Sequence, residues 1–168
     1  GNPSSVYTHT ADFNLDGYQD LLVINSGQTE PVIMLNNLGR WVNQPFNYDW
    51  ENEPIETRAC AIGDYDADGD MDLVFAQGTS GVRMYRNDTK STQEWIGLRL
   101  LNPNSITPVV DCQVIMQFQE CKQLATTSAV TSSAGQDQPL IILASTMPDK
   151  SEEAYVHIAW PNGIKSHY

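Results

Sequence analysis

The chain has 168 residues with 21 Asp and Glu against nine Lys and Arg, which gives a net charge of −12. This length is enough to bury one good hydrophobic core or two small ones. The acidity argues against nucleic acid and anionic membrane surfaces as partners, because both attract basic patches. No apolar run reaches about 18 residues, so we expect no transmembrane helix and no membrane insertion.

The first third of the chain predicts short β-strands on both sides of an Asp-rich loop at residues 12–20. Gly27 and residues 37–39 provide turns between the later strands, and residues 43–54 are expected to connect to a second unit. Four such strands in order form one up-and-down antiparallel sheet, the blade unit of a β-propeller. The predicted strands are residues 6–11, 21–25, 31–36 and 40–42.

A second unit repeats this plan around the loop at residues 64–72. Its strands are predicted at residues 58–63, 73–76 and 82–86, with a turn at residues 78–81. The similar stretches 34–37 and 84–87 mark the same strand in the two copies. The loops begin 52 residues apart, which is about the length of one repeat in a propeller array.

Both loops place oxygen-bearing side chains at alternate positions, with a glycine in sixth place. Carboxylates this crowded repel one another unless a cation neutralises them, and a ring of hard oxygen ligands suits calcium. Gly69 allows the sharp turn because glycine adopts positive φ without steric cost. We predict two Ca²⁺ ions, with Tyr18 and Asp70 ligating through their carbonyls. The predicted side-chain ligands are Asp12, Asn14, Asp16 and Asp20 in the first loop and Asp64, Asp66, Asp68 and Asp72 in the second.

An EF-hand begins in the same way but requires a bidentate Glu at position twelve and flanking helices. Position twelve is Val23 in one loop and Phe75 in the other, and a short apolar run follows each loop. The loops are therefore expected to connect β-strands. The alternative is a pair of solvated Asp-Gly turns, and the repetition of the whole pattern favours calcium.

The loop motifs at residues 12–21 and 63–73 resemble FG-GAP/VCBS repeats, the calcium-binding blades of integrin-like β-propellers. The resemblance covers residues 6–88 and implies blades at about 6–43 and 56–88 within a domain of residues 1–89. It implies calcium ligation by the residues named above and a secreted or cell-surface location. Asn87-Asp88-Thr89 is in addition a possible N-glycosylation site.

Residues 90–168 predict a separate all-β segment. It resembles the ASPIC/UnbV domain, which follows such blades in cartilage-acidic-protein-like secreted proteins, at residues 95–100, 132–135 and 157–163. Residues 143–146 depart from that family's usual turn. We expect a small antiparallel β-sandwich or barrel-like domain. Its predicted strands are residues 95–101, 109–118, 121–130, 140–144, 154–160 and 164–168.

The three cysteines are expected to be buried as small hydrophobic side chains. If the hairpin turn is centred on residues 119–120, Cys121 lies opposite Phe118 and Cys112 lies opposite Thr127. This register keeps the two thiols too far apart to form a disulfide. Cys60 is the third cysteine.

No catalytic pattern is found, and we expect a protein that is not an enzyme. His9, His157 and His167 are scattered without a second histidine at metal-binding spacing, and His157 is interpreted as a surface residue. There is no nucleophile-elbow motif and no Gly-rich phosphate loop. The four tryptophans could line a ligand surface, but we favour their interpretation as core residues; they are Trp41, Trp50, Trp95 and Trp160.

The leading hypothesis is an extracellular calcium-binding adhesion, interaction or structural module in which calcium makes the blade loops rigid. Two blades cannot close a propeller, so one alternative is a self-assembling filament or surface-layer subunit that pairs its exposed β edges between copies. Another alternative is a carbohydrate-recognising accessory domain of an enzyme. The sequence leaves the protein or glycan partner open.

Overall fold

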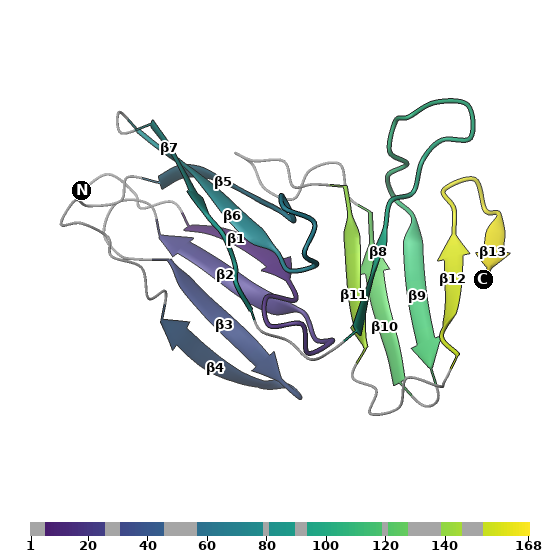
Figure 1. Ribbon diagram of the computed structural model, residues 1–168, viewed down its shortest axis with the longest axis horizontal. Coiled ribbons are helices and arrows are strands. Elements are labelled where there is room, and N and C mark those ends of the chain that lie inside the picture. Colours follow the sequence, from purple (N-terminus) through teal and green to yellow (C-terminus); the bar gives the residue numbers. More distant parts are fainter. Residues whose placement is uncertain are drawn as a thin grey trace.

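The computed structural model describes residues 6–25, 31–45, 57–78, 81–89, 94–118, 121–127, 139–145 and 153–168. These residues are all-β: they form antiparallel sheets, contain no helix, and none of the sheets closes into a barrel (Figure 1). The barrel-like arrangement expected for the C-terminal part is therefore not found in them. Within the same residues, no helix has the length and apolar character needed to cross a membrane.

The first sheet has the predicted up-and-down order β1-β2-β3-β4. Each strand pairs antiparallel with the next, and the buried side chains of β2 alternate with half-buried ones, as a sheet with one face on the core requires. Its strands are β1 (Val6–Ala11), β2 (Asp20–Asn25), β3 (Val32–Asn37) and β4 (Arg40–Pro45). The last strand runs three residues beyond its predicted end at Val42.

The second sheet contains β5 (Thr57–Gly63), β6 (Asp72–Gln77) and β7 (Gly81–Tyr85), in that order. It lacks a counterpart of β4 among the described residues, so it repeats the first sheet only in part. The next described strand, β8 (Glu94–Leu98), pairs instead with β11 (Ile141–Ser145) in the C-terminal part of the chain.

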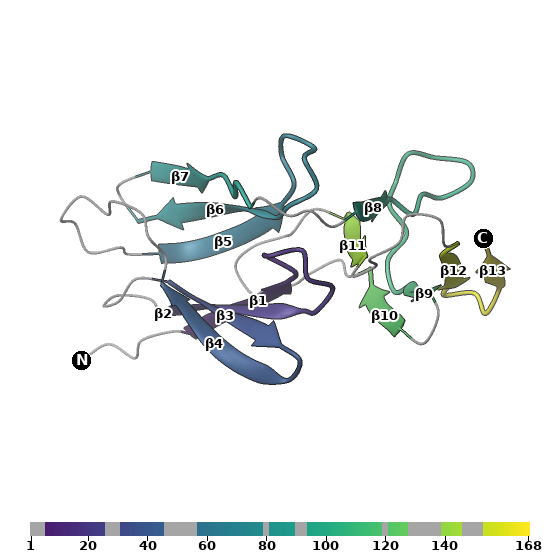
Figure 2. The same ribbon diagram turned by 60° about the horizontal axis from the view of Figure 1, so that its bottom comes forward.

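These two sheets lie as facing layers, which Figure 2 shows most clearly. Their shared core takes Leu22 and Ile24 from β2 and Phe75 from β6, all at most 1% exposed. The ring of Phe75 meets Tyr85 edge to face at a centroid distance of 5.6 Å. The apolar runs that follow the two Asp-rich loops therefore become the centre of one core.

The C-terminal part contains a four-stranded sheet in the order β10-β9-β12-β13. A second core of buried side chains joins this sheet to the β8–β11 ribbon, with Val114 and Val156 on one side and Leu143 on the other. The strands are β9 (Gln113–Phe118), β10 (Cys121–Thr126), β12 (Tyr155–Ala159) and β13 (Lys165–His167).

The predicted β9–β10 hairpin register is confirmed. Cys121 lies opposite Phe118, and Cys112 is held to Thr127 by a hydrogen bond from its amide to the threonine hydroxyl of 2.9 Å. Strand β9 begins four residues later than predicted, just after Asp111, whose φ of 61° is incompatible with an extended strand.

The cysteine prediction is confirmed for Cys60 and Cys112, which are both buried thiols. The side chain of Cys121 lies outside the described residues. The core interpretation is wrong for Trp41 and Trp95, which are 49% and 40% exposed. Trp160 packs partly buried against the second core, and Trp50 lies outside the described residues.

The two Asp-rich loops contact the β8–β11 ribbon. Leu15 of the first loop is buried in a small cluster with Ile142 and Ala144 of β11, and Met71 packs against this cluster. On the second loop, Gly69 lies directly under the indole of Trp95 from β8, so closely that an added Cβ would overlap the ring. Both loops are thus held between the N-terminal sheets and the C-terminal part.

Candidate metal centre

The two loops have the same backbone conformation. In each, the residue at position four and the glycine at position six both have positive φ: 55° and 88° for Leu15 and Gly17, and 62° and 98° for Ala67 and Gly69. Positive φ is uncommon for residues other than glycine. The repeated sequence pattern therefore corresponds to a repeated backbone conformation, although the sequence did not indicate the left-handed Leu15 and Ala67.

The first aspartate of each loop closes it through hydrogen bonds from the backbone. Asp12 accepts from the amides of Asp16 and Gly17 at 3.0 and 2.8 Å. Asp64 accepts from the equivalent amides four and five residues later, both at 3.2 Å. These bonds curl the loop so that its carboxylates stay on one side.

The last aspartate of each loop is hydrogen-bonded to the third strand of its sheet in the first copy, and to the segment just after that strand in the second copy. Asp20 accepts from the amides of Phe13 and Asn36, both at 2.8 Å. Asp72 accepts from Tyr65 at 2.9 Å and from Asn87 at 2.8 Å. Asn36 is therefore equivalent to Asn87, so the two copies of this strand align one residue away from the register expected from stretches 34–37 and 84–87.

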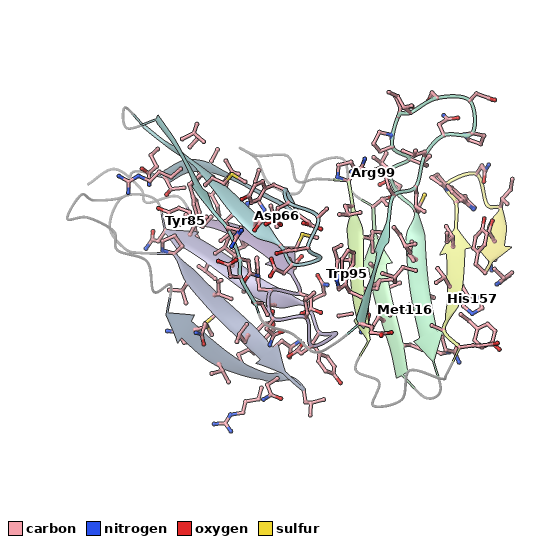
Figure 3. All side chains as sticks on the ribbon, viewed as in Figure 1. Asp66, Tyr85, Trp95, Arg99, Met116 and His157 are labelled. Carbon is pink, nitrogen blue, oxygen red and sulfur yellow. The ribbon has the colours of Figure 1, made fainter. Side chains whose placement is uncertain are left out.

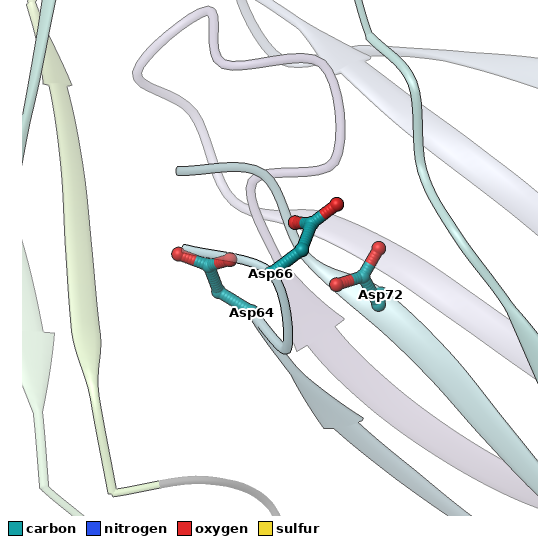
Figure 4. Close-up of side chains that lie close together, drawn as sticks. All are labelled: Asp64, Asp66 and Asp72. Atoms are coloured by element: carbon teal, nitrogen blue, oxygen red, sulfur yellow. The ribbon is translucent and has the colours of Figure 1, made fainter. Parts of the chain in front are cut away.

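Three carboxylates of the second loop come together (Figure 4). One oxygen from each of Asp64, Asp66 and Asp72 lies within 4.8 Å of the other two. Oxygens bound to one calcium at 2.3–2.6 Å can be no more than about 5 Å apart, so this spacing fits a single ion. Among the described His, Cys, Asp and Glu side chains, this is the one group in which three potential ligand atoms lie this close together.

The other predicted ligands are arranged differently. Asp68 is not in this group, and its carboxylate accepts from the amide of Asp70 at 3.2 Å. In the first loop, the amide of Asn14 donates to Asp16 at 2.9 Å. Asn14 stands at the position of Asp66, so the first loop lacks the third carboxylate of such a group. The first-loop ligand set, Asp68, and the carbonyls of Tyr18 and Asp70 remain predictions.

Burial shifts the protonation of the loop carboxylates. It raises the pKa of Asp12 to about 7, against the lowering effect of its two backbone hydrogen bonds. Burial, and then the neighbouring charge of Asp68, raises the pKa of Asp70 to about 7. Burial also raises the pKa values of Asp20 and Asp72. In the absence of a cation, these sites therefore resist carrying negative charge.

Basic side chains compensate this charge only weakly. Arg86 lies 3.6 Å from Asp66 and also pairs with Asp88, and its own side chain is half exposed. The inner oxygen Oδ1 of Asp70 is buried without a hydrogen-bond partner. The donor set is rich in oxygen and negative charge, which is the chemistry that a hard divalent cation requires.

Asn87 and Thr89 connect the two loops, a role that the sequence did not indicate. The side-chain amide of Asn87 and the hydroxyl of Thr89 both donate to the carbonyl of Phe13, at 2.8 and 3.2 Å. The backbone amide of Thr89 donates to the carboxylate of Asp70 at 3.0 Å. Asn87 remains a predicted glycosylation site. Its side-chain nitrogen uses one N–H in this partly buried contact, so a glycan would have to be attached in place of the other hydrogen.

The view that the histidines are scattered is wrong for one pair. His157 and His167 face each other on β12 and β13, because the final hairpin folds residues ten positions apart onto opposite strands. Only the register of that hairpin reveals the pair.

A family model for the FG-GAP-like repeat matches residues 12–75, from the first aspartate of the first loop to the middle of β6. Residues 12–75 contain an FG-GAP-like repeat. FG-GAP repeats are typical of extracellular or cell-surface proteins. The match includes both Asp-rich loops and no residue after 75, so the ASPIC/UnbV resemblance stays a prediction. A search of curated proteins gave no significant match.

The roles of Asp72 and Asp66 in metal-free protein should differ. Asp72→Ala leaves two backbone N–H groups without their acceptor, at a cost of about 1–3 kcal/mol for each donor that stays buried. Asp66→Ala removes only a carboxylate beside the exposed Arg86 and should change stability by less than about 0.5 kcal/mol. Urea unfolding of both variants measures the difference, and equal losses would contradict a structural role for Asp72.

Proposed function

We propose that this protein is an extracellular, calcium-stabilised interaction module without catalytic activity. The observation that carries the proposal is the convergence of Asp64, Asp66 and Asp72 within a loop of an FG-GAP-like repeat. The first loop, with the same backbone hydrogen bonds at Asp12 and Asp20, would hold a second ion. The N-terminal sheets would act as propeller-type blades.

Calcium would supply the charge that the protein itself lacks. The two loops contain eight of the 21 acidic residues, and two calcium ions would change the net charge from −12 to −8. Extracellular modules bind calcium with Kd values of about 10⁻⁴ to 10⁻³ M. Sites of this affinity fill outside cells and stay largely empty in cytosol, which agrees with the location typical of FG-GAP repeats.

The ion would also fix how the C-terminal part is held. Leu15 and Met71 pack against the cluster of Ile142 and Ala144, and Trp95 covers Gly69. A loop that is rigid presents these contacts in one geometry, whereas a loop opened by carboxylate repulsion would not. Calcium would therefore control how the N-terminal sheets and the C-terminal part are placed relative to each other, and with that the shape of the surface offered to a protein or glycan partner.

Calcium should raise the thermal stability of the protein in a manner that depends on Asp66. Occupation of one site at a hundred times its Kd contributes about 2.7 kcal/mol, which corresponds to roughly 5–10 °C in Tm for a domain of this size. Asp66→Asn should reduce this gain, because it removes a converging oxygen charge without breaking a loop hydrogen bond. Calorimetry with and without chelator measures the shift.

Asp111→Asn is the matched control, since it removes one exposed carboxylate that belongs to neither loop. It should respond to calcium as the wild type does. A Tm that is indifferent to chelator in the wild-type protein would overturn the calcium proposal.

Metal-free protein should become less stable as the pH rises from about 4 to 8. The folded-state pKa of Asp12 is raised from 3.8 to about 7, so its contribution to stability is complete below pH 3.8 and is lost as the pH passes through about 7. Stabilisation by calcium should increase over the same interval, because the ion binds the ionised form.

Unfolding of protein freed of metal by chelation and desalting measures this slope. Asp12→Asn should reduce the slope in part, because Asp70, whose pKa is also raised to about 7, still contributes to it. Asp111→Asn should leave the slope unchanged. If Asp12→Asn retained the full slope, burial of the Asp12 charge would not be the cause.

Self-assembly through strand edges is a second candidate function. Among the described strands, β4 and β7 each pair on one side only. They also expose apolar side chains, with Trp41 at 49%, Met84 at 46% and Val82 at 70%. Unpaired edges of this kind favour strand addition from another molecule.

If copies pair at these edges, light scattering in calcium should show a mass that rises with concentration. Val82→Lys places a charge on the β7 edge and should reduce the assembly. Ile106→Lys changes a residue that is 90% exposed but lies outside the strands, and it should have no effect. A monomer at all concentrations would rule this function out.

A further inference from the structure

The last hairpin fixes His157 and His167 in a defined relation. Val156 and Tyr168 exchange both backbone hydrogen bonds, each at 2.9 Å, and the Trp160 amide donates to Ile164 at 2.9 Å. In an antiparallel pair, hydrogen-bonded and non-hydrogen-bonded positions alternate. His157 and His167 therefore occupy a non-hydrogen-bonded position, where opposite Cα atoms are only about 4.5 Å apart and the side chains lie closest.

The two imidazoles face each other on this hairpin, at the edge of the sheet where Figure 3 labels His157. Their Nδ1 atoms are 2.5 Å apart, and the rings meet edge to face with centroids 4.8 Å apart and planes inclined by 77°. His157 is partly exposed and His167 is exposed. The two Nδ1 atoms thus lie against each other at a solvent-accessible place on the hairpin.

The hairpin is constrained on both sides of the pair. At the turn, Gly163 has a φ of 84° and donates to the carbonyl of Trp160 at 3.0 Å, while the Ile164 amide donates to Asn162 at 3.0 Å. The Trp160 indole donates to Ser166 at 2.9 Å. These contacts fix the register, so the two donors are already opposed before any ligand arrives.

We propose that His157 and His167 form a second kind of metal site, which takes a divalent transition metal of the Zn²⁺, Cu²⁺ or Ni²⁺ class. Imidazole suits these ions, whereas calcium prefers oxygen. Nitrogens bound tetrahedrally to zinc at 2.0–2.1 Å lie about 3.3 Å apart. Rotation of the two rings by less than about 1 Å at the nitrogens reaches this separation.

The site is a two-ligand clip whose remaining positions are open. The described residues place no third His, Cys, Asp or Glu within reach of the pair. Water, or a donor from another molecule, completes the coordination. The bound metal joins the three-residue edge strand β13 to β12, and it does so independently of the Asp-rich loops.

The test titrates Cu²⁺ and Zn²⁺ into protein saturated with calcium, so that the carboxylate loops are already filled. Calorimetry should show one additional site, and the electron paramagnetic resonance spectrum of bound Cu²⁺ should show nitrogen ligands. Even the loss of a residue that only hydrogen-bonds to a metal ligand costs roughly 10- to 100-fold in metal affinity. His157→Gln and His167→Gln should each weaken binding by at least that factor.

Lys165→Gln is the matched control, because Lys165 is exposed on the same face of β13 two residues before His167 and should be dispensable. An unchanged calcium-dependent Tm in each variant shows that the fold is intact. Binding that is equally strong in the variant lacking both histidines, or no nitrogen signal from bound Cu²⁺, would overturn the proposal and leave an imidazole pair joined only by a hydrogen bond.

Discussion

The structure depends on buried carboxylates that hold the backbone together while carrying charge that the described basic side chains neutralise only weakly. Asp20 and Asp72 each accept two backbone amides, one from their own loop and one from a residue in, or two residues after, the third strand of their sheet. An ionised acceptor makes these bonds strong. Burial works in the opposite direction by raising the pKa of the same groups. A hard cation resolves this conflict, because it keeps the carboxylates ionised without exposing them to water.

The same loops also join the parts of the molecule. The first loop places Leu15 in the cluster with Ile142 and Ala144, and the second lies under Trp95. Asn87 and Thr89 connect the second sheet to the first loop through the carbonyl of Phe13. Contacts between sheets, between loops and with the C-terminal ribbon thus meet within a few residues of the candidate ligands. A change in loop charge therefore acts at a junction, where small displacements affect several interfaces at once.

The sequence predicted what depends on local pattern. The Asp-rich loops, the order of the first four strands and the register at Cys121 follow from residue spacing and turn chemistry. Features set by tertiary pairing were not predictable. The meeting of His157 with His167 depends on hairpin register, and the equivalence of Asn36 and Asn87 depends on the length of the connection between strands. Trp41 was misassigned because residue type alone does not show that its strand lies at a sheet edge, where its side chain is 49% exposed.

The two loops differ in how far they depend on a cation. Asn14 replaces a carboxylate, and its amide donates to Asp16, so the first loop contains an internal donor that offsets part of the repulsion. The second loop has Asp66 at the equivalent position, and the nearby basic group is the half-exposed Arg86. Three of its carboxylates nevertheless come within 4.8 Å of one another. We therefore expect the second loop to need an ion more, and the first loop to keep its shape better without one. If calcium binds both loops, the second is the one whose occupancy should control the contact between Gly69 and Trp95.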